Sequence, residues 1–201
     1  MRKVMHVLTL FSAVSVLAQQ NVPPPPPSAS PSVIPTDSGP SLEATMNFIE
    51  EKLNSIGRIS FAQFQHDGVK DIDLPPIKMS YKVTSVRAIA KDCRVDYHYW
   101  SAVSSATVPE RVLADKDSGF SLREVQEVGT ATGEQALKEA NSKAGRPELN
   151  FQVDPPTFVL FVKLKSTKEN FRLYDASLAE RLTKALQHAV ELCGGGSKDP
   201  F

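Results

Sequence analysis

The sequence predicts an α+β fold: an N-terminal helix, five to seven mainly antiparallel strands in a curved sheet or small barrel, and a C-terminal amphipathic helix packed on the sheet. Two observations lead to this prediction. Strong helical spacing of apolar residues occurs near the two ends of the region after residue 40, whereas alternating apolar residues fill much of its middle. This order of elements leaves few crossover connections for parallel pairing.

The first 18 residues are predicted to be a signal peptide. A short basic start precedes a largely apolar run, Val4–Leu17. As a helix this run rises roughly 21 Å, which is too short for a hydrocarbon core of about 30 Å. Val16 and Ala18 suit cleavage before Gln19. We therefore expect an exported protein, periplasmic or secreted, whose mature chain has no transmembrane segment.

Residues 19–40 are predicted to be a disordered, proline-rich tether. They hold eight of the fifteen prolines, including the run Pro23–Pro27, and a single charged residue, Asp37. Proline without an apolar packing face favours extended polyproline II, which acts as a semi-rigid spacer. The alternative is a ligand for a proline-binding domain, which export disfavours because such domains are mainly intracellular.

A single globular domain is expected over residues 41–193. Its first element is a helix that begins after Ser41, a favourable N-cap residue, and ends before Gly57. The apolar residues between them are spaced four, three, four and three positions apart, which places them on one helix face. They are Leu42, Met46, Ile49, Leu53 and Ile56.

Strands are predicted through the middle of the domain. Apolar and polar residues alternate in Ile77–Val83 and in Cys93–Val103, as in half-buried strands. Phe120–Val128 predicts one further strand whose phase slip a bulge would explain. Phe158–Leu164 is continuously apolar, which is typical of a strand covered on both faces, and a polar turn joins it to a partner strand at Phe171.

Two more helices are predicted in the second half of the domain. Residues 132–146 include few apolar residues, which indicates a short surface helix within a long connection. Pro147 is expected to end this helix. The last helix is the clearest: Ser177 and Glu180 match a capping box, and its apolar residues share about 140° of the helical wheel. Gly194 ends this helix, and residues 194–201 are expected to form a flexible, glycine-rich tail.

The closing elements resemble those of a known fold. A last hairpin that leads directly into a helix ending at a glycine, over Phe171–Cys193, is similar to the end of pleckstrin-homology-like barrels. The stretch Leu182–Gly196 also looks like the ends of uncharacterised exported bacterial proteins. The first resemblance implies a small barrel with a C-terminal helix over Ile59–Cys193. The second implies no known activity, and folds of this kind host many functions.

The two cysteines, Cys93 and Cys193, are predicted to form a disulfide. Each stands at the end of an element, and the export signal places the chain in an oxidising compartment. The alternative is a pair of buried thiols, since both residues fall on apolar faces. Two distant cysteines without CxxC or HxxxH spacing do not make a metal site, so neither a metal nor another cofactor is expected.

Candidate binding residues stand in two places. Trp100 offers a stacking surface with His98 beside it on the same strand face, and packing of Trp100 under the first helix is the alternative. Basic residues around the last hairpin suit phosphates or an anionic surface, although a solvated sheet face explains them as well. These residues are Lys163, Lys165, Lys168 and Arg172.

The sequence favours a non-catalytic module that binds an unknown protein or envelope component. With 23 basic and 23 acidic residues, the chain lacks the positive charge that nucleic-acid binding requires. It contains no GxSxG or SxxK motif and no phosphate-binding glycine loop. The alternatives are a small exported hydrolase that uses His66 or His98, and a lipid-surface-binding barrel. The hydrolase requires one of these histidines to face a pocket with a carboxylate or hydroxyl within hydrogen-bond reach.

Overall fold

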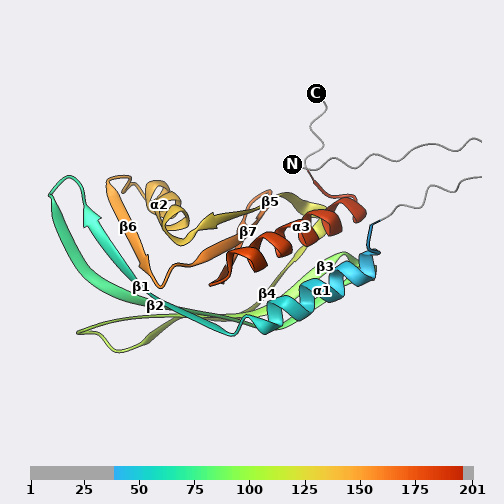
Figure 1. Ribbon diagram of the computed structural model, residues 1–201, viewed down its shortest axis with the longest axis horizontal. Coiled ribbons are helices and arrows are strands. Elements are labelled where there is room, and N and C mark those ends of the chain that lie inside the picture. The colour runs from blue at the N-terminus through green and yellow to red at the C-terminus, as the bar shows by residue number, and fades with distance from the viewer. Residues whose placement is uncertain (1–38, 197–201) are drawn as a thin grey trace, which may run out of the picture. The chain divides into compact units, whose positions relative to one another are not determined.

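The structure, a computed structural model, describes residues 39–196, so the predicted signal peptide and nearly all of the predicted tether lie outside the described residues. Within this range the chain forms three helices and eight strands (Figure 1). In chain order these are α1 (Leu42–Ser55), β1 (Arg58–Asp67), β2 (Ile72–Ile89), β3 (Arg94–Ser105), β4 (Arg111–Ser121), β5 (Val125–Thr132), α2 (Gly133–Lys143), β6 (Leu149–Asp154), β7 (Phe158–Leu164), β8 (Lys168–Leu173) and α3 (Ala176–Leu192). The predicted α+β fold is confirmed.

The described strands form two antiparallel sheets and no closed barrel. Five strands pair in the order β4-β3-β2-β1-β6, and three pair in the order β5-β7-β8. The single strand predicted over Phe120–Val128 is wrong, because the chain leaves β4 after Ser121, turns through Leu122–Glu124 and enters β5 in the other sheet. The phase slip in the sequence therefore marks a crossing between sheets and not a bulge.

Helix α1 covers the part of β2 that extends beyond β1. Its predicted N-cap is confirmed, because the Ser41 hydroxyl accepts a hydrogen bond from the third residue of the helix. The Asn54 side chain donates to the carbonyl of Val86 and accepts from its N–H, both at 3.0 Å. Glu50 accepts from the N–H of Ala88 at 2.8 Å. These side chains satisfy backbone groups that would otherwise lack partners at the edge of the sheet.

Helix α3 lies beside α1 and packs on β5 and β7 (Figure 1). Its N-cap is Asp175, whose carboxylate accepts from the N–H of Leu178 at 3.1 Å. The predicted capping box at Ser177 is therefore wrong, since that residue already lies in the first turn. After the helix, the N–H of Gly196 donates to the carbonyl of Val125 at 3.0 Å, so the predicted tail is still attached to the fold at this point.

The surface helix predicted between residues 132 and 146 is confirmed as α2. Thr132 and Gln135 form a reciprocal capping box at its start. The helix packs mainly on β6, with further contacts to β5 and β7, so it covers a region where the two sheets meet.

Two groups of buried hydrophobic residues form the core. The larger joins both long helices to both sheets, through residues such as Met46, Leu160 and Leu186. The smaller consists of Ile59, Phe61 and Val153. Between the sheets, the hydroxyl of Tyr97 on β3 donates to Glu169 on β8. Burial and this carboxylate raise the pKa of Tyr97, so the phenol stays protonated and connects the sheets.

The predicted disulfide between Cys93 and Cys193 is confirmed, with Cα atoms 5.8 Å apart. Cys93 has a left-handed backbone conformation before β3, and Cys193 is the C-cap of α3. The bond therefore ties the last helix to the start of β3. A separate finding concerns membranes: in residues 39–196 no helix is both long and apolar enough to cross one.

Candidate functional site

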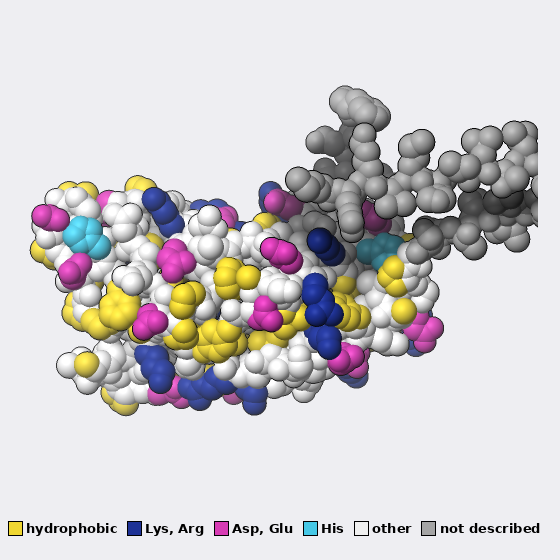
Figure 2. Space-filling model, in the orientation of Figure 1, with side chains coloured by type: hydrophobic (Ala, Val, Ile, Leu, Met, Phe, Trp, Pro, Cys, Tyr) yellow, Lys and Arg dark blue, Asp and Glu magenta, His cyan; other side chains and the backbone are white. Residues whose placement is uncertain are grey.

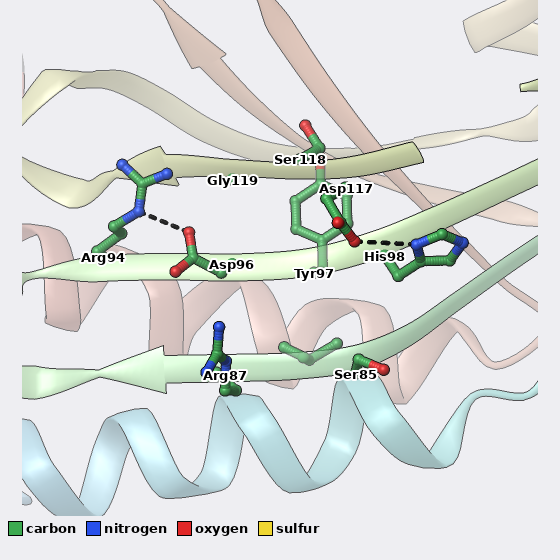
Figure 3. A pocket seen from close by; sticks show the side chains of 10 residues that line it. Ser85, Arg87, Arg94, Asp96, Tyr97, His98, Asp117, Ser118 and Gly119 are labelled. Atoms are coloured by element: carbon green, nitrogen blue, oxygen red, sulfur yellow. Dashed lines mark hydrogen bonds and ion pairs between the residues drawn. The ribbon is translucent and has the colours of Figure 1, made fainter. Parts of the chain in front are cut away.

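The first candidate site is a depression of about 660 Å³ on the outer face of β2, β3 and β4 (Figure 3). Antiparallel pairing brings its polar side chains together, because His98 lies opposite Asp117 across β3 and β4. Ser85 and Arg87 lie on β2, next to the site (Figure 3). The remaining lining residues are Val86, Arg94, Asp96, Tyr97, Ser118 and Gly119. We call this site the outer depression.

His98 is held between two carboxylates in the outer depression. Its Nε2 lies 2.7 Å from Asp115 and its Nδ1 lies 3.0 Å from Asp117. Hydrogen bonds to Asp117 and then to Asp115 raise the pKa of His98, so these carboxylates favour the imidazolium form. Both ring nitrogens are engaged, which leaves neither free to take a proton from a substrate or from Ser118.

The other charges of the outer depression are partly neutralised within it. Arg94 forms an ion pair with Asp96 (Figure 3). A Cβ at Gly119 would clash with the Asp96 carboxylate and lie 2.8 Å from the carbonyl of Val95, so glycine allows these groups to sit close to β4. Apart from Arg87, the charged residues that line the depression are paired with one another, which suits a solvated surface better than a catalytic cleft.

The second predicted histidine, His66, lies near the end of β1, opposite Asp73 of β2. Its Nδ1 is 3.0 Å from Asp73 and its Nε2 is 3.5 Å from Asp71, and its side chain is about 40% exposed. It borders a depression of about 420 Å³ whose apolar walls include Phe64 and Phe151. As with His98, carboxylates occupy both sides of the ring. Among the described residues, no group of three or more His, Cys, Asp or Glu side chains is placed to hold a metal ion.

Trp100 lies on the outer face of β3, on the same side as His98. The guanidinium of Arg58 stacks on the indole, 4.7 Å from the ring centroid, and also forms an ion pair with Glu110. Trp100 belongs to neither buried cluster, so the alternative in which it packs under the first helix is wrong. Arg58 already occupies the surface that was predicted to stack on a ligand.

The structure separates the four basic residues predicted around the last hairpin. Lys163 pairs with Glu127 at 3.4 Å, and Lys165 is exposed in the turn between β7 and β8. Lys168 and Arg172 lie on the face of β8 opposite Phe171, which is buried in the core. That alternation directs Lys168 and Arg172 toward a cleft between the two sheets.

This inter-sheet cleft is the second candidate site, with a volume of about 350 Å³. Its aromatic walls are Tyr81 on β2 and Tyr99 on β3, with ring centroids 6.3 Å apart. The other lining residues come from α2, β7 and β8; they are Ala136, Leu137, Glu139, Ala140, Lys143, Val159, Lys168, Asn170 and Arg172. The cleft therefore combines an apolar interior with charged side chains, as ligand pockets commonly do.

Arg172 is the distinctive group of the inter-sheet cleft. Its guanidinium carbon lies 4.8 Å from the ring centroids of both Phe61 and Tyr81. Its Nη1 atom is buried and has no hydrogen-bond partner in residues 39–196. No ion pair links Arg172 to an acidic side chain within the same range. Aromatic stacking thus fixes a guanidinium whose charge has no carboxylate beside it.

The other charged residues of the cleft bind one another. Glu139 accepts hydrogen bonds from Lys143 and Lys168, each at 2.7 Å, and these bonds lower the pKa of Glu139 to about 2. Burial raises the pKa of Tyr99, which keeps its hydroxyl protonated. With three cations and one carboxylate, the lining of the cleft carries a net charge of +2.

Comparison of the chain with protein-family models, with curated proteins and with solved structures finds no match. Of the residues predicted for binding, the inter-sheet cleft contains Lys168 and Arg172, whereas His98 lines the outer depression.

Proposed function

We propose that the domain is a non-catalytic, exported binding module and that the inter-sheet cleft holds a small ligand. The observation that supports this most is the guanidinium of Arg172, which has no acidic partner within residues 39–196 and lies beside a cleft walled by Tyr81 and Tyr99. No histidine, serine or cysteine is among the described lining residues of the cleft, and its two lysines are both bound to Glu139, so support for a nucleophile with an adjacent base is weak there. The disulfide supports export, because such bonds persist in oxidising compartments.

The two alternative functions have weaker support. A hydrolase requires a histidine nitrogen that can accept a proton, and carboxylates lie on both sides of His98 and of His66. A lipid-binding surface requires free cations on one face, and Lys163 and Lys168 are paired with glutamates. These observations leave the cleft as the better candidate.

Filling the cleft tests this proposal. NMR spectra of the purified domain are recorded during titration with 2-naphthoate and, separately, with 2-naphthamide. We expect saturable shifts at Tyr81 and Tyr99 for at least one probe. Ala136→Phe, which puts a ring into the cleft from α2, should abolish them. Ser142→Phe adds the same ring on an exposed part of α2 outside the cleft and should leave binding unchanged. Unaltered binding in Ala136→Phe would contradict the proposal.

A further inference from the structure

We infer that the ligand of the inter-sheet cleft is a small carboxylate with a flat apolar body, and that Arg172 recognises its carboxylate. This inference rests on the proposed function of the cleft and assigns the chemical class of what it binds. It is supported by the position of Arg172, the charges around it and the shape of the apolar walls.

The guanidinium of Arg172 is held in place before any ligand arrives. Phe61 and Tyr81 stack nearly parallel, with an interplanar angle of 8°, and the guanidinium carbon lies 4.8 Å from each ring centroid. An arginine stays charged at all ordinary pH values, and its planar fork matches the two oxygens of a carboxylate. Because the aromatic contacts already restrict this fork, less conformational entropy is lost when it binds an anion.

The surrounding charges favour an anion and limit how much charge it carries. The cleft lining has a net charge of +2, but Lys143 and Lys168 are both bound to Glu139. Arg172 is therefore the cation without an acidic partner among the described residues of the cleft, which suits a single negative charge. A phosphate dianion would call for several free cationic donors, and the lysines are not free to supply them.

The rest of the cleft suits a flat apolar body. Tyr81 and Tyr99 present ring surfaces, and Leu137 and Val159 contribute aliphatic ones. The volume of about 350 Å³ is at the small end of the range for ligand pockets, so one or two fused rings fit better than a long chain. Burial keeps the Tyr99 hydroxyl protonated, so it can donate a hydrogen bond and adds no negative charge.

The inference is tested by comparing an anion with its neutral analogue of nearly the same shape. Dissociation constants of 2-naphthoate and 2-naphthamide are measured by NMR or fluorescence titration at a fixed salt concentration. We expect 2-naphthoate to bind about tenfold more tightly, as a charge-assisted hydrogen-bond pair implies. Arg172→Met keeps an apolar stem over Phe61 and Tyr81 but removes the charge. It should weaken 2-naphthoate about tenfold and change 2-naphthamide less than about twofold.

Two further variants separate the possible outcomes. Lys165→Met removes an exposed cation outside the cleft and should affect neither probe. Arg172→Lys keeps the positive charge but not the planar guanidinium, so its preference for 2-naphthoate over 2-naphthamide should be intermediate. This variant replaces Arg172→Met in the test if the methionine variant does not fold. Equal binding of both probes to the unaltered protein would overturn the carboxylate inference while the proposed function stands. Failure of both probes to perturb the cleft would overturn the proposed function itself.

Discussion

The two ends of the domain differ in how they are held together. At one, the helix-covered end, α1, α3 and the disulfide enclose the larger buried cluster. At the other, the hairpin end, β1 and β6 share a buried cluster of three residues, and Phe64, Val69 and Ile72 near the β1–β2 turn are exposed. Figure 2 shows hydrophobic side chains in a band along the middle of one face. The difference indicates that the stability of the domain depends mainly on the helix-covered end. Side chains outside that end are therefore available for contacts with other molecules.

The largest expected effect comes from the disulfide. Replacing both cysteines, Cys93→Ala with Cys193→Ala, removes a cross-link that closes 100 residues of chain. We expect the free energy of unfolding to fall by about 2–5 kcal/mol and Tm to fall by about 10 °C. Denaturant unfolding followed by circular dichroism measures this change. A variant as stable as the unaltered protein would mean that the helix-covered end does not depend on the bond.

A matched pair of leucines compares the two ends directly. Leu186 on α3 is fully buried in the larger cluster, whereas Leu149 on β6 is buried at the hairpin end. Leu186→Ala should lower the free energy of unfolding by about 3 kcal/mol, and Leu149→Ala should lower it by less. Amide hydrogen exchange should then accelerate throughout the domain for Leu186→Ala, but mainly in β1, β2 and β6 for Leu149→Ala. If both variants lose the same free energy of unfolding and show the same exchange pattern, the two ends do not differ in stability.

A smaller effect is expected where α1 covers the edge of β2. Asn54→Ala removes both hydrogen bonds to Val86 and leaves a partly buried N–H and carbonyl without these partners. We expect a loss of about 2 kcal/mol in the free energy of unfolding. Asn47→Ala, an exposed position on the same helix, is the control and should change stability little. Similar free energies of unfolding for the two variants would mean that the N–H and carbonyl of Val86 find other hydrogen-bond partners.

The smallest effect concerns the pH dependence of the outer depression. The raised pKa of His98 means that its contribution to stability is fully present below the unfolded-state value of 6.5 and is lost as pH rises through the folded-state pKa. NMR titration of the His98 ring should give a midpoint above 6.5. The double variant Asp115→Asn with Asp117→Asn should lower that midpoint. An unshifted midpoint in the variant would show that these carboxylates do not set the protonation of His98.

Local sequence patterns predicted the elements whose burial follows a simple period. The stripe of α1 and the continuous apolar run of β7 are examples, and the cysteine pair followed from the expected compartment. The sequence only partly indicates the strand β1, because Gln63 is buried in place of an apolar residue and interrupts the alternation of apolar and polar residues. The short strand β6, with only two buried residues, gave no clear signal.

The inter-sheet cleft could not be assembled from the sequence in the same way. The sequence predicts Lys168 and Arg172 only as basic residues around the last hairpin, and it predicts Ile77–Val83, which contains Tyr81, only as a half-buried strand. The contact between Arg172 and Tyr81 depends on how the three-stranded sheet packs on the five-stranded one. No local period encodes that packing. An arginine between apolar strand residues near the end of a hairpin was the one signal available.

The position of the disulfide has a mechanical consequence. The bond between Cys93 and Cys193 closes a covalent ring that contains every element from β3 to α3, whereas α1, β1 and β2 precede it. Tension applied at the two ends of the described chain would pass through the bond and bypass the ring. Apart from the short segment after Cys193, only the residues before Cys93 could then be extended, and they would lengthen the molecule by at most about 180 Å at roughly 3.4 Å per residue. Under tension, the segment before Cys93 would therefore extend, whereas the segment closed by the disulfide would keep its length.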